Sequence, residues 1–576
     1  MHFRVNIILL NMKVNPVILK NYCAALVLLT FSVGAIAAPE IRLVLQVTVD
    51  QLRGDLPLRH MQQFGKGGFA LLKDKGVWYT NAAYQHANTE TIVGHSSLAT
   101  GALPAVHGMI GNVWLDRDSG KLVYNVEDPR YTLLSDNADV DKASEIDPTQ
   151  RVANSDGRSP LAILSSTFSD ELAIRYPGQS KIYGVSIKDR GAIPLAGDSG
   201  KAFWFSKAAG AFVSSSYYYD SYPDWVRNWN SAGKLDRYAG QRWELTNEPD
   251  SYQRIDQDDN DWETDFPGYG RTFPHAWGDR DSKYFTTLLT VSPAGDELTL
   301  DFAKTLLLEE GLGEDSVPDY LSISFSSTDY VGHLFGSSSL EMEDNLIRLD
   351  RTLADLFKFI DQEVGLKHTL IVLSADHGGP EAPGYLQELH QDADYVDDQL
   401  FTADALNGLL HDKLNVTADL VKTYFHPYVY LDREAVGREG LGLAATQRAL
   451  AEALLQLPDV AYAYTASDIT QGLLKDSAIA TMVSANHQDK RSGDVYVVFE
   501  SRAFINDFDG LTVAATHGSV WRYDRHVPII FLGNGIKAGT VSRAVTPYDI
   551  APTLSNILEL EAPSGSGGEP LPEVTQ

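Results

Sequence analysis

The sequence is poor in cysteine: among its 576 residues, only Cys23 carries a thiol. Cys23 lies in an apolar N-terminal segment that we expect to be removed, so the remaining chain can form no disulfide bond. That chain also offers no thiolate as a nucleophile or a metal ligand. A metal ion bound here must therefore be held by histidine, carboxylate or hydroxyl groups.

Basic residues are scarce as well. The chain has 47 Lys and Arg against 77 Asp and Glu, a formal net charge of −30. A surplus of negative charge repels phosphate backbones and anionic lipid surfaces. We therefore expect no nucleic-acid partner. Most of the acidic residues should form a solvated surface, although a cation site also needs carboxylates.

Long hydrophobic runs are missing too, apart from residues 23–37, which follow Lys13 and Lys20. This run is about 15 residues long, short of the ~20 residues of a membrane span. Ala35-Ile36-Ala37 has the small-x-small form of a signal-peptidase site. We expect residues 1–37 to be a signal peptide and the protein to be periplasmic or secreted, without stable membrane insertion after cleavage. An uncleaved anchor is the alternative.

What the chain does contain is a series of short β-branched runs that alternate with helical patterns. The expected strands are residues 41–49, 77–81, 181–187, 320–325, 369–373, 494–499 and 527–532. The expected helices are residues 69–72, 91–100, 160–173, 298 up to a stop at Gly311, 340–364, 444–455 and 547–560. This alternation predicts an α/β fold with a largely parallel central sheet flanked by helices.

We expect one catalytic domain over residues 38–562. Two stretches without sustained periodicity, residues 203–285 and 385–490, are interpreted as inserted cap regions. Residues 563–576 are rich in Gly, Ser, Pro and Glu, and this composition predicts a flexible tail. His86 and His487 are expected at the surface.

The segment from Asn88 to Ser97 places Thr91 at the start of an expected helix. The N–H groups and the dipole at a helix N-terminus favour negative charge, which suits an alkoxide that attacks a phosphate. A threonine in this position is also an ordinary helix cap. Thr91 alone therefore does not decide between the two interpretations.

Six further side chains could bind metal ions, and they follow the expected strands or lie in separate polar segments. They are Asp50, Asp329, His333, Asp376, His377 and His517. Each has an ordinary alternative, since Asp after a strand is often a turn residue. As a set, nitrogen and oxygen ligands without thiols suit zinc or a similar divalent ion. Open α/β sheets also place ligand sites at the carboxyl ends of their strands.

The order of these motifs resembles the alkaline phosphatase superfamily, most closely its periplasmic alkaline phosphatases with a threonine nucleophile. The nucleotide pyrophosphatase/phosphodiesterases are related enzymes of that superfamily. The matching pieces are Val49-Asp50-Gln51, Thr91-x-x-Gly94-His95, His107-Gly108 with Gly111-Asn112, Lys188-Asp189-Arg190-Gly191, Thr328-Asp329-Tyr330-x-Gly332-His333, Ala375-Asp376-His377-Gly378, Arg491-Ser492-Gly493-Asp494 and Thr516-His517-Gly518. A single Asp-His-Gly is a weak signal, whereas the ordered set is specific.

The resemblance implies a role for each matching residue. Two divalent metal ions, zinc in most members, would be bound at two sets of ligands. The first set is Asp329, His333 and His517, and the second is Asp50, Asp376 and His377 with the oxygen of Thr91. Thr91 would be the nucleophile, and Asn112, Lys188 and Arg190 would contact the phosphoryl oxygens. His95 and His107 are assigned packing or hydrogen-bonding roles.

These roles predict an enzyme that hydrolyses small-molecule phosphate esters through a phospho-threonine. Lys188 and Arg190 are two positions apart, so in an extended segment both cations would face one anion. Two cations suit a monoester dianion better than a diester, which favours a phosphomonoesterase. A phosphodiesterase or nucleotide pyrophosphatase of the same superfamily is the alternative. A non-catalytic phosphate- or metal-binding protein is a further one, disfavoured by the intact nucleophile.

Overall fold

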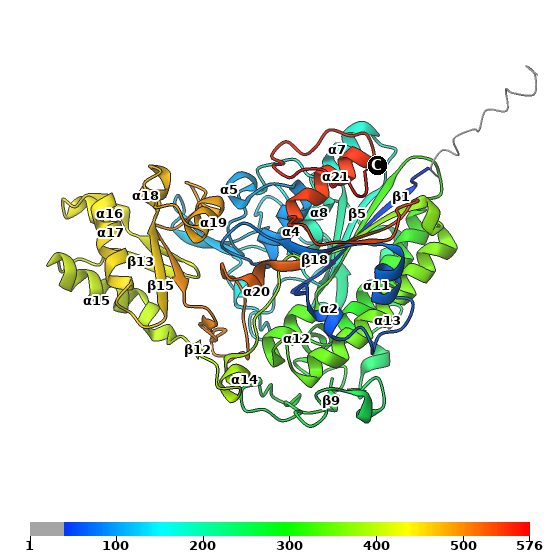
Figure 1. The fold of residues 1–576 in the computed structure, drawn as a ribbon, viewed down its shortest axis with the longest axis horizontal. Helices are drawn as coiled ribbons and strands as arrows, with labels where there is room; N and C mark the ends of the chain where they lie inside the picture. Colours follow the sequence, from blue (N-terminus) through cyan, green and yellow to red (C-terminus); the bar gives the residue numbers. More distant parts are fainter. Residues whose placement is uncertain (1–39, 576) are drawn as a thin grey trace, which may run out of the picture. The chain divides into compact units, whose positions relative to one another are not determined.

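The computed structural model describes residues 40–575. The expected signal peptide, residues 1–37, lies outside the described residues. From Ile41 onward the chain forms one compact unit built on a nine-stranded sheet (Figure 1). In spatial order its strands are β19 (Gly539–Val541), β2 (Val77–Ala83), β18 (His526–Gly533), β11 (Thr369–Ser374), β1 (Leu43–Val49), β10 (Asp319–Phe325), β5 (Ile182–Ser186), β6 (Lys201–Ser206) and β7 (Ala211–Val213).

Most neighbouring strands of this sheet are parallel. β11, β1, β10, β5 and β6 form a continuous parallel array. β18 runs antiparallel to β11 and β2, and β7 runs antiparallel to β6. The apolar runs of β1 and β10 are buried along their whole length, as expected for strands covered on both faces. The predicted α/β fold with a largely parallel sheet is confirmed.

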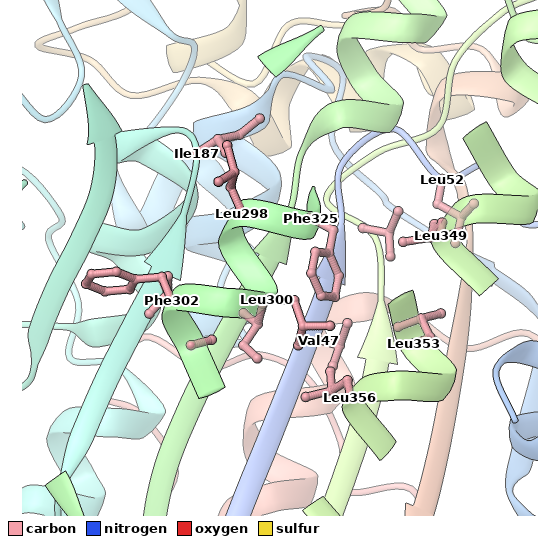
Figure 2. Packing of buried hydrophobic residues seen from close by; sticks show 14 of the residues in the cluster. Val47, Leu52, Ile187, Leu298, Leu300, Phe302, Phe325, Leu349, Leu353 and Leu356 are labelled. Atoms are coloured by element: carbon pink, nitrogen blue, oxygen red, sulfur yellow. The ribbon is translucent and has the colours of Figure 1, made fainter. Parts of the chain in front are cut away.

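Helices cover both faces of the sheet, and β1 shows how the two cores are separated. Val47 points into the core under α11 (Pro293–Glu310) and α13 (Leu340–Glu363), where it belongs to one cluster with Leu298 and Leu353 (Figure 2). Val44 belongs to the core on the opposite face. This alternation follows from the two-residue period of a strand. Both long helices were predicted, including the end of α11 at Gly311.

The other face is covered by shorter helices that include the Thr91 segment. They are α4 (Thr91–Thr100), α7 (Phe168–Arg175), α8 (Asp189–Ala196) and α21 (Ile550–Ile557). The remaining α-helices are α2 (Leu56–Arg59), α3 (Phe69–Lys75), α5 (Pro104–His107), α6 (Pro148–Arg151), α9 (Asp224–Ser231), α10 (Phe285–Thr290), α12 (Ser327–Phe335), α14 (Pro383–Glu388), α15 (Ala403–Leu414), α16 (Arg433–Arg438), α17 (Leu443–Leu454), α18 (Ala466–Thr470), α19 (Ala478–Asn486) and α20 (Arg522–Arg525). None of the helices in the described part of the chain combines the length and the apolar character that crossing a bilayer requires.

A second, four-stranded antiparallel sheet forms a subdomain with its own apolar core. Its strands are, in spatial order, β13 (Val421–Phe425), β14 (Tyr428–Leu431), β16 (Val495–Phe499) and β15 (Val460–Thr465). The predicted insertion at 385–490 falls in this region. β16 was expected as a strand, but it pairs within this small sheet, so the subdomain extends past residue 490. Short two-stranded pairings complete the structure: β3 (Val113–Asp116) with β4 (Lys121–Tyr124), β8 (Arg242–Trp243) with β9 (His275–Ala276), and β12 (Asp394–Tyr395) with β17 (Ala503–Phe504).

Three local expectations were wrong. The helix expected over residues 160–173 begins only at Phe168, where Thr167 and Asp170 form a capping box. The start of the expected cap region at 203–285 is part of the main sheet instead, because the buried run Lys201–Ser206 pairs with β5. The tail is not detached: Leu571 is buried in the core under α21.

Candidate active site

The candidate residues converge at one edge of the main sheet. Asp50 follows β1, Lys188 follows β5 and Asp376 follows β11, and these three strands are parallel. Asp329 and His333 lie one turn apart on α12, directly after β10. His517 precedes β18, which runs in the opposite direction, so its N-terminal end lies at the same edge. The predicted arrangement at the carboxyl ends of the strands follows from this topology.

The first ligand group consists of Asp329, His333 and His517. One ligand atom from each of the three lies within 4.8 Å of the others. Asp329 Oδ1 is 3.4 Å from His333 Nε2 and 3.2 Å from His517 Nε2. All three side chains are at least nine-tenths shielded from solvent. The structure therefore brings together the first predicted set.

The second ligand group consists of Asp50, Asp376 and His377. His377 Nε2 lies 3.4 Å from Asp50 Oδ1 and 3.4 Å from Asp376 Oδ2, and all three side chains are fully buried. Asp329 connects the two groups, since its carboxylate also clusters within 4.8 Å of Asp50 and His377. The rings of His377 and His517 stack with centroids 3.7 Å apart. The two groups thus form one continuous polar centre.

The three histidines present the same ring nitrogen to the carboxylates. In each ring Nδ1 contacts a backbone carbonyl, namely Ala515 O for His333, Gly378 O for His377 and Thr89 O for His517. A proton on Nδ1 satisfies this contact and leaves Nε2 as the ligand atom. Burial lowers the pKa of His517 to about 3, which favours its neutral ring. Burial opposes a charge on His377, but Asp376 and Asp50 outweigh it and raise its pKa to about 9.

This donor set fits divalent cations. Asp50 Oδ1, Asp329 Oδ1 and His377 Nε2 are buried atoms without a hydrogen-bond partner. The ammonium of Lys188 forms an ion pair with Asp50 and with Asp329. Among the described side chains it is the only partner of these two carboxylates whose charge does not depend on the protonation of a histidine. Three buried carboxylates with one lysine leave an excess of negative charge, and buried charges require partners. Nitrogen and oxygen ligands of this kind are those that zinc prefers.

Thr91 is the first residue of α4 and follows a cap residue, Glu90, in extended conformation. The interpretation of Thr91 itself as the cap is therefore wrong. Its Oγ1 is buried and has no hydrogen-bond partner. The helix packs directly on the second ligand group, because a Cβ on Gly94 would lie 2.0 Å from Asp376 O. Only glycine permits this approach, which places the N-terminal turn of α4 beside the carboxylates.

Asn112 lies beside this turn. Its Oδ1 accepts a hydrogen bond from Ile92 N at 3.2 Å, which leaves the amide N–H groups as donors. Its backbone N–H donates to Glu90 Oε2 at 2.5 Å. Burial raises the pKa of Glu90 to about 7. Glu90 was not among the predicted residues, although it fixes the position of Asn112 next to Thr91.

Lys188 and Arg190 are arranged differently from the sequence expectation. Lys188 is extended, but Arg190 already lies in the first turn of α8, so the expected extended segment is wrong. Lys188 Nζ is fully buried, 2.8 Å from Asp50 Oδ2 and 2.5 Å from Asp329 Oδ2. Arg190 Nη2 lies 2.8 Å from Asp147 Oδ2, and its Nη1 donates to Tyr124 Oη at 3.2 Å. The contacts of both cations with a phosphoryl group stay a prediction.

Residues that sequence reasoning missed hold Arg190 in place. Asp147 forms an ion pair with Arg190, and Asp189 accepts hydrogen bonds from Tyr124 Oη at 2.5 Å and Arg158 Nε at 2.7 Å. Burial opposes a charge on Asp147, but the positive charge of Arg190 keeps its pKa well below the usual range. Asp147 comes from the irregular stretch after Asn112, where no periodicity marks its position. Of these residues, only Asp189 could have been found from the sequence, because it lies next to Arg190 in the motif.

The predictions for the other four histidines were right for two of them and wrong for two. His95 contacts Thr91 O at 2.9 Å, Asp376 Oδ2 at 3.1 Å and Ser324 Oγ at 2.9 Å. His107 contacts Ser97 Oγ, so the packing and hydrogen-bonding roles of both are confirmed. His86 was expected at the surface, but it is buried and its Nδ1 lies 2.6 Å from Tyr548 Oη. The His487 side chain is only 9% exposed, so that expectation was wrong as well.

A cavity of ≈ 450 Å³ opens above the site. Thr91, Asn112, Arg190, Asp329, His333 and His517 line its floor. Its walls come from residues 146–149, from the small sheet and from residues 503–513. Residues of the second predicted insertion, 385–490, line the cavity. None of the described lining residues comes from the first, 203–285. The cavity can therefore place a small anionic group against Thr91 and Arg190.

Comparisons with known proteins agree with this architecture. Residues 44–520 match the model of the family described as type I phosphodiesterase / nucleotide pyrophosphatase. Alkaline phosphatase PafA of Elizabethkingia meningoseptica is 32% identical over 93% of this chain and 95% of its own length. A protein of Myroides odoratus named calcium-transporting ATPase is 32% identical over 95% and 97%. Alkaline phosphatase PhoV of Synechococcus elongatus is 31% identical over 92% of both chains.

Solved structures show the same fold. The crystal structure of wild type alkaline phosphatase PafA has a TM-score of 0.85 and 31% identity, over 94% of this chain and 100% of that chain. A PafA variant with substitutions at a threonine, an asparagine, a lysine and an arginine has a TM-score of 0.84. Matched along most of its length, this chain belongs to the type I phosphodiesterase / nucleotide pyrophosphatase family.

Proposed function

We propose that the protein is an exported, metal-dependent phosphomonoesterase that hydrolyses phosphate monoesters through a covalent phospho-threonine at Thr91. The observation that carries this proposal is the position of Thr91 Oγ1. It is buried, lacks a hydrogen-bond partner, and lies in the helix turn that packs on Asp376. The names of PafA and PhoV support phosphatase activity. Export rests on the expected signal peptide.

The two ligand groups would hold two divalent metal ions, zinc in the superfamily that the sequence resembles, which when bound stabilise negative charge on the attacking and leaving oxygens. The buried, unpartnered carboxylate oxygens support this assignment. The chain itself supplies the geometry. Because each histidine ring is held through Nδ1 by a backbone carbonyl, its Nε2 keeps one orientation.

In the proposed reaction, Thr91 Oγ forms a bond to phosphorus while the bond from phosphorus to the ester oxygen breaks. The threonine hydroxyl loses its proton to solvent, and the departing alkoxide takes one from solvent, so that the alcohol leaves without a net change in protons. Water then attacks the phospho-threonine, which releases phosphate and restores the hydroxyl. The N-terminal turn of α4 favours the negative charge that gathers at Thr91 during both steps.

Arg190 and Asn112 would bind the phosphoryl oxygens from the cavity floor. Arg190 is oriented by Asp147 and Tyr124, so its guanidinium needs little rearrangement to engage an anion. Lys188 adds a second buried cation next to the site. A monoester dianion carries more charge than a diester, and this supports a monoester substrate. The substituted threonine and asparagine of the PafA variant have the same separation along the chain as Thr91 and Asn112, and its lysine and arginine the same as Lys188 and Arg190.

The proposal is tested with purified protein, its metal content and two variants. Thr91→Ala should abolish phosphate release from an aryl phosphate while the melting temperature stays close to that of the wild type. Thr91→Ser keeps a hydroxyl and should retain measurable turnover. Metal analysis should find about two divalent ions per chain, and their removal with a chelator should abolish activity reversibly. Undiminished turnover in Thr91→Ala would overturn the mechanism.

A phosphodiesterase is the second candidate, because the family whose model matches is named for diester and pyrophosphate cleavage. We expect kcat/KM to be higher for a monoester than for a diester with the same leaving group. Arg190→Ala should reduce the monoester value more than the diester value, since the dianion depends more on this cation. A diester preference in the wild type would establish the second candidate instead.

A further inference from the structure

The cavity lining includes a group of large apolar side chains, mostly aromatic, in addition to the polar residues of the floor. We call this group the aromatic wall. Its residues come from the small sheet, from the turn at residues 398–401 that precedes the sheet, and from the segment that follows it. The wall residues are Phe401, Tyr424, Phe499, Phe504, Phe508 and Leu511. The ring of Phe401 packs against two others, with ring centroids 5.1 Å from Tyr424 and 5.2 Å from Phe499. These contacts hold three of the rings together.

Phe508 connects this wall to the catalytic centre. Its ring lies 5.0 Å from the ring of His333 at an interplanar angle of 61°. It is carried by the strap, which we define as residues 506–513. The strap is followed by Ala514 and Ala515, whose N–H groups donate to His333 O at 2.9 and 3.2 Å. The aromatic wall therefore starts directly beside a member of the first ligand group.

The tip of the strap is fastened to α6, whose first residues, Pro148 and Thr149, also line the cavity. Arg151 Nη2 donates to Phe508 O at 2.8 Å, and Arg151 Nη1 lies 3.2 Å from Asp509 Oδ2. Arg151 is the last residue of α6, the helix that begins beside Asp147. These two contacts fix the backbone of Phe508 relative to α6.

The position of Phe508 corresponds to the leaving-group side of the proposed reaction. Thr91 belongs to the side of the second ligand group, since His95 contacts both Thr91 O and Asp376 Oδ2. In an in-line displacement the departing oxygen lies opposite the nucleophile. That places the alcohol toward the first ligand group, where Phe508 covers His333.

We propose that Phe508 and the aromatic wall form a leaving-group subsite that selects phosphate monoesters of aromatic alcohols. This inference rests on the proposed phosphomonoesterase function and adds the substrate class to it. A planar ring can bury its faces against the wall and pack edge-to-face with Phe508. A leaving group with a second negative charge is disfavoured, because Asp398 and Asp507 also line the cavity.

The experiment compares benzyl phosphate with propyl phosphate. Both are esters of primary alcohols with similar reactivity, so the ring is the main difference between them. For the wild type we expect kcat/KM to be on the order of tenfold higher for the benzyl ester, the factor that corresponds to a well-packed ring. Phe508→Ala should reduce this ratio to about one to two. Arg151→Gln, which loosens the strap tip and leaves every wall side chain unchanged, should reduce the ratio as well.

Tyr462→Ala is the matched control. Tyr462 is an aromatic residue of the same small sheet, but it is 41% exposed and lies outside the cavity lining. We expect this variant to keep both kcat/KM values. Equal values for the two esters in the wild type would overturn the subsite while leaving the phosphomonoesterase intact. An equal loss for both esters in Phe508→Ala would also overturn it, since Phe508 would then act only by supporting His333. Failure to hydrolyse either ester would overturn the proposed function, and the subsite with it.

Discussion

Lys188 Nζ lies 2.5 Å from Asp329 Oδ2, in the interior of the protein and out of contact with solvent. The same ammonium lies 2.8 Å from Asp50 Oδ2, so it spans the two ligand groups. Burial opposes the charge, but the two carboxylates outweigh it and raise the pKa of Lys188. Lys188 and divalent metal ions would therefore neutralise the same carboxylates. This relationship leads to a test that separates charge balance from phosphoryl binding.

Replacing Lys188 with Met keeps the length and the apolar stem of the side chain but removes its charge. In chelator-treated protein we expect the free energy of unfolding to fall by about 3–5 kcal/mol, because two buried carboxylates lose their partner. In metal-loaded protein the loss should be smaller, since the ions neutralise those carboxylates. If Lys188 also contacts the phosphoryl group, kcat/KM for a monoester should fall by a factor on the order of 10².

Denaturant unfolding with and without metal, together with initial rates, measures both effects. Lys234→Met is the control, because Lys234 forms a half-exposed pair with Asp301. This substitution should cost less than about 1 kcal/mol in either condition. Equal losses for Lys188→Met with and without metal would mean that Lys188 and the metal ions do not share their charge-balancing role.

Much of the fold could be predicted because its strands are buried on both faces. β1 and β10 are continuous apolar runs; Asp50 follows β1 directly, and Asp329 lies in the helix that follows β10. Both could be named as candidates from these places, and the ordered motifs then assigned them as ligands. The long amphipathic pattern of α13 was equally clear. A parallel sheet collects the ends of such strands at one edge, so convergence of the ligands followed from the expected topology.

Other features depend on tertiary contacts that no local pattern reports. β6 is rich in aromatic residues and was interpreted as part of an irregular cap, yet its residues pair in register with β5. Arg190 is helical because α8 starts immediately after Lys188, which the two-residue spacing could not show. Asp147 reaches Arg190 from a polar region without periodicity. These positions are set by packing between segments distant in sequence.

Asp147 is expected to act as a positioning residue for Arg190. Asp147→Asn keeps the oxygen that accepts from Thr149 N and caps α6, but it removes the charge that faces Arg190. We expect KM for a monoester to rise by a factor on the order of ten, with a smaller change in kcat, because the guanidinium loses its charged partner. Asp128→Asn is the control, since Asp128 pairs with the largely exposed Arg130. An unchanged KM in Asp147→Asn would contradict the positioning role.

Asp319 gives a pH dependence with a defined sign. It lies at the start of β10, remote from the ligand groups, and accepts hydrogen bonds from Lys181 N and Gly313 N. Burial raises its pKa from 3.8 to about 6. The pKa of Asp319 is higher in the folded chain than in the unfolded chain, so the protonated carboxyl stabilises the fold. This contribution to the free energy of unfolding is fully present below pH 3.8. It is lost as the pH rises through about 6.

In Asp319→Asn the side chain at this position cannot titrate. The free energy of unfolding of the variant, relative to that of the wild type, should therefore increase between pH 4 and pH 8 and then stay constant. The expected change is on the order of 2 kcal/mol. Denaturant unfolding of both proteins across this pH range measures it, and the comparison cancels the titration of all other groups. A constant difference from pH 4 to pH 8 would show that the pKa of Asp319 is the same in the folded and unfolded chain.

The C-terminal segment should contribute to stability, contrary to its composition. Leu571 is 1% exposed and packs in the core that also contains Tyr79 and Phe531, and its N–H donates to Thr553 Oγ1 at 2.9 Å. Truncation of a buried leucine removes apolar contacts and leaves a cavity, so Leu571→Ala should reduce the free energy of unfolding by about 2–4 kcal/mol. Leu308→Ala removes the same atoms from a side chain that is 52% exposed, and should cost less than about 1 kcal/mol. Equal effects of the two substitutions would mean that residues 563–575 do not pack on the core in solution, because only a docked segment makes the buried leucine more costly to remove than the exposed one.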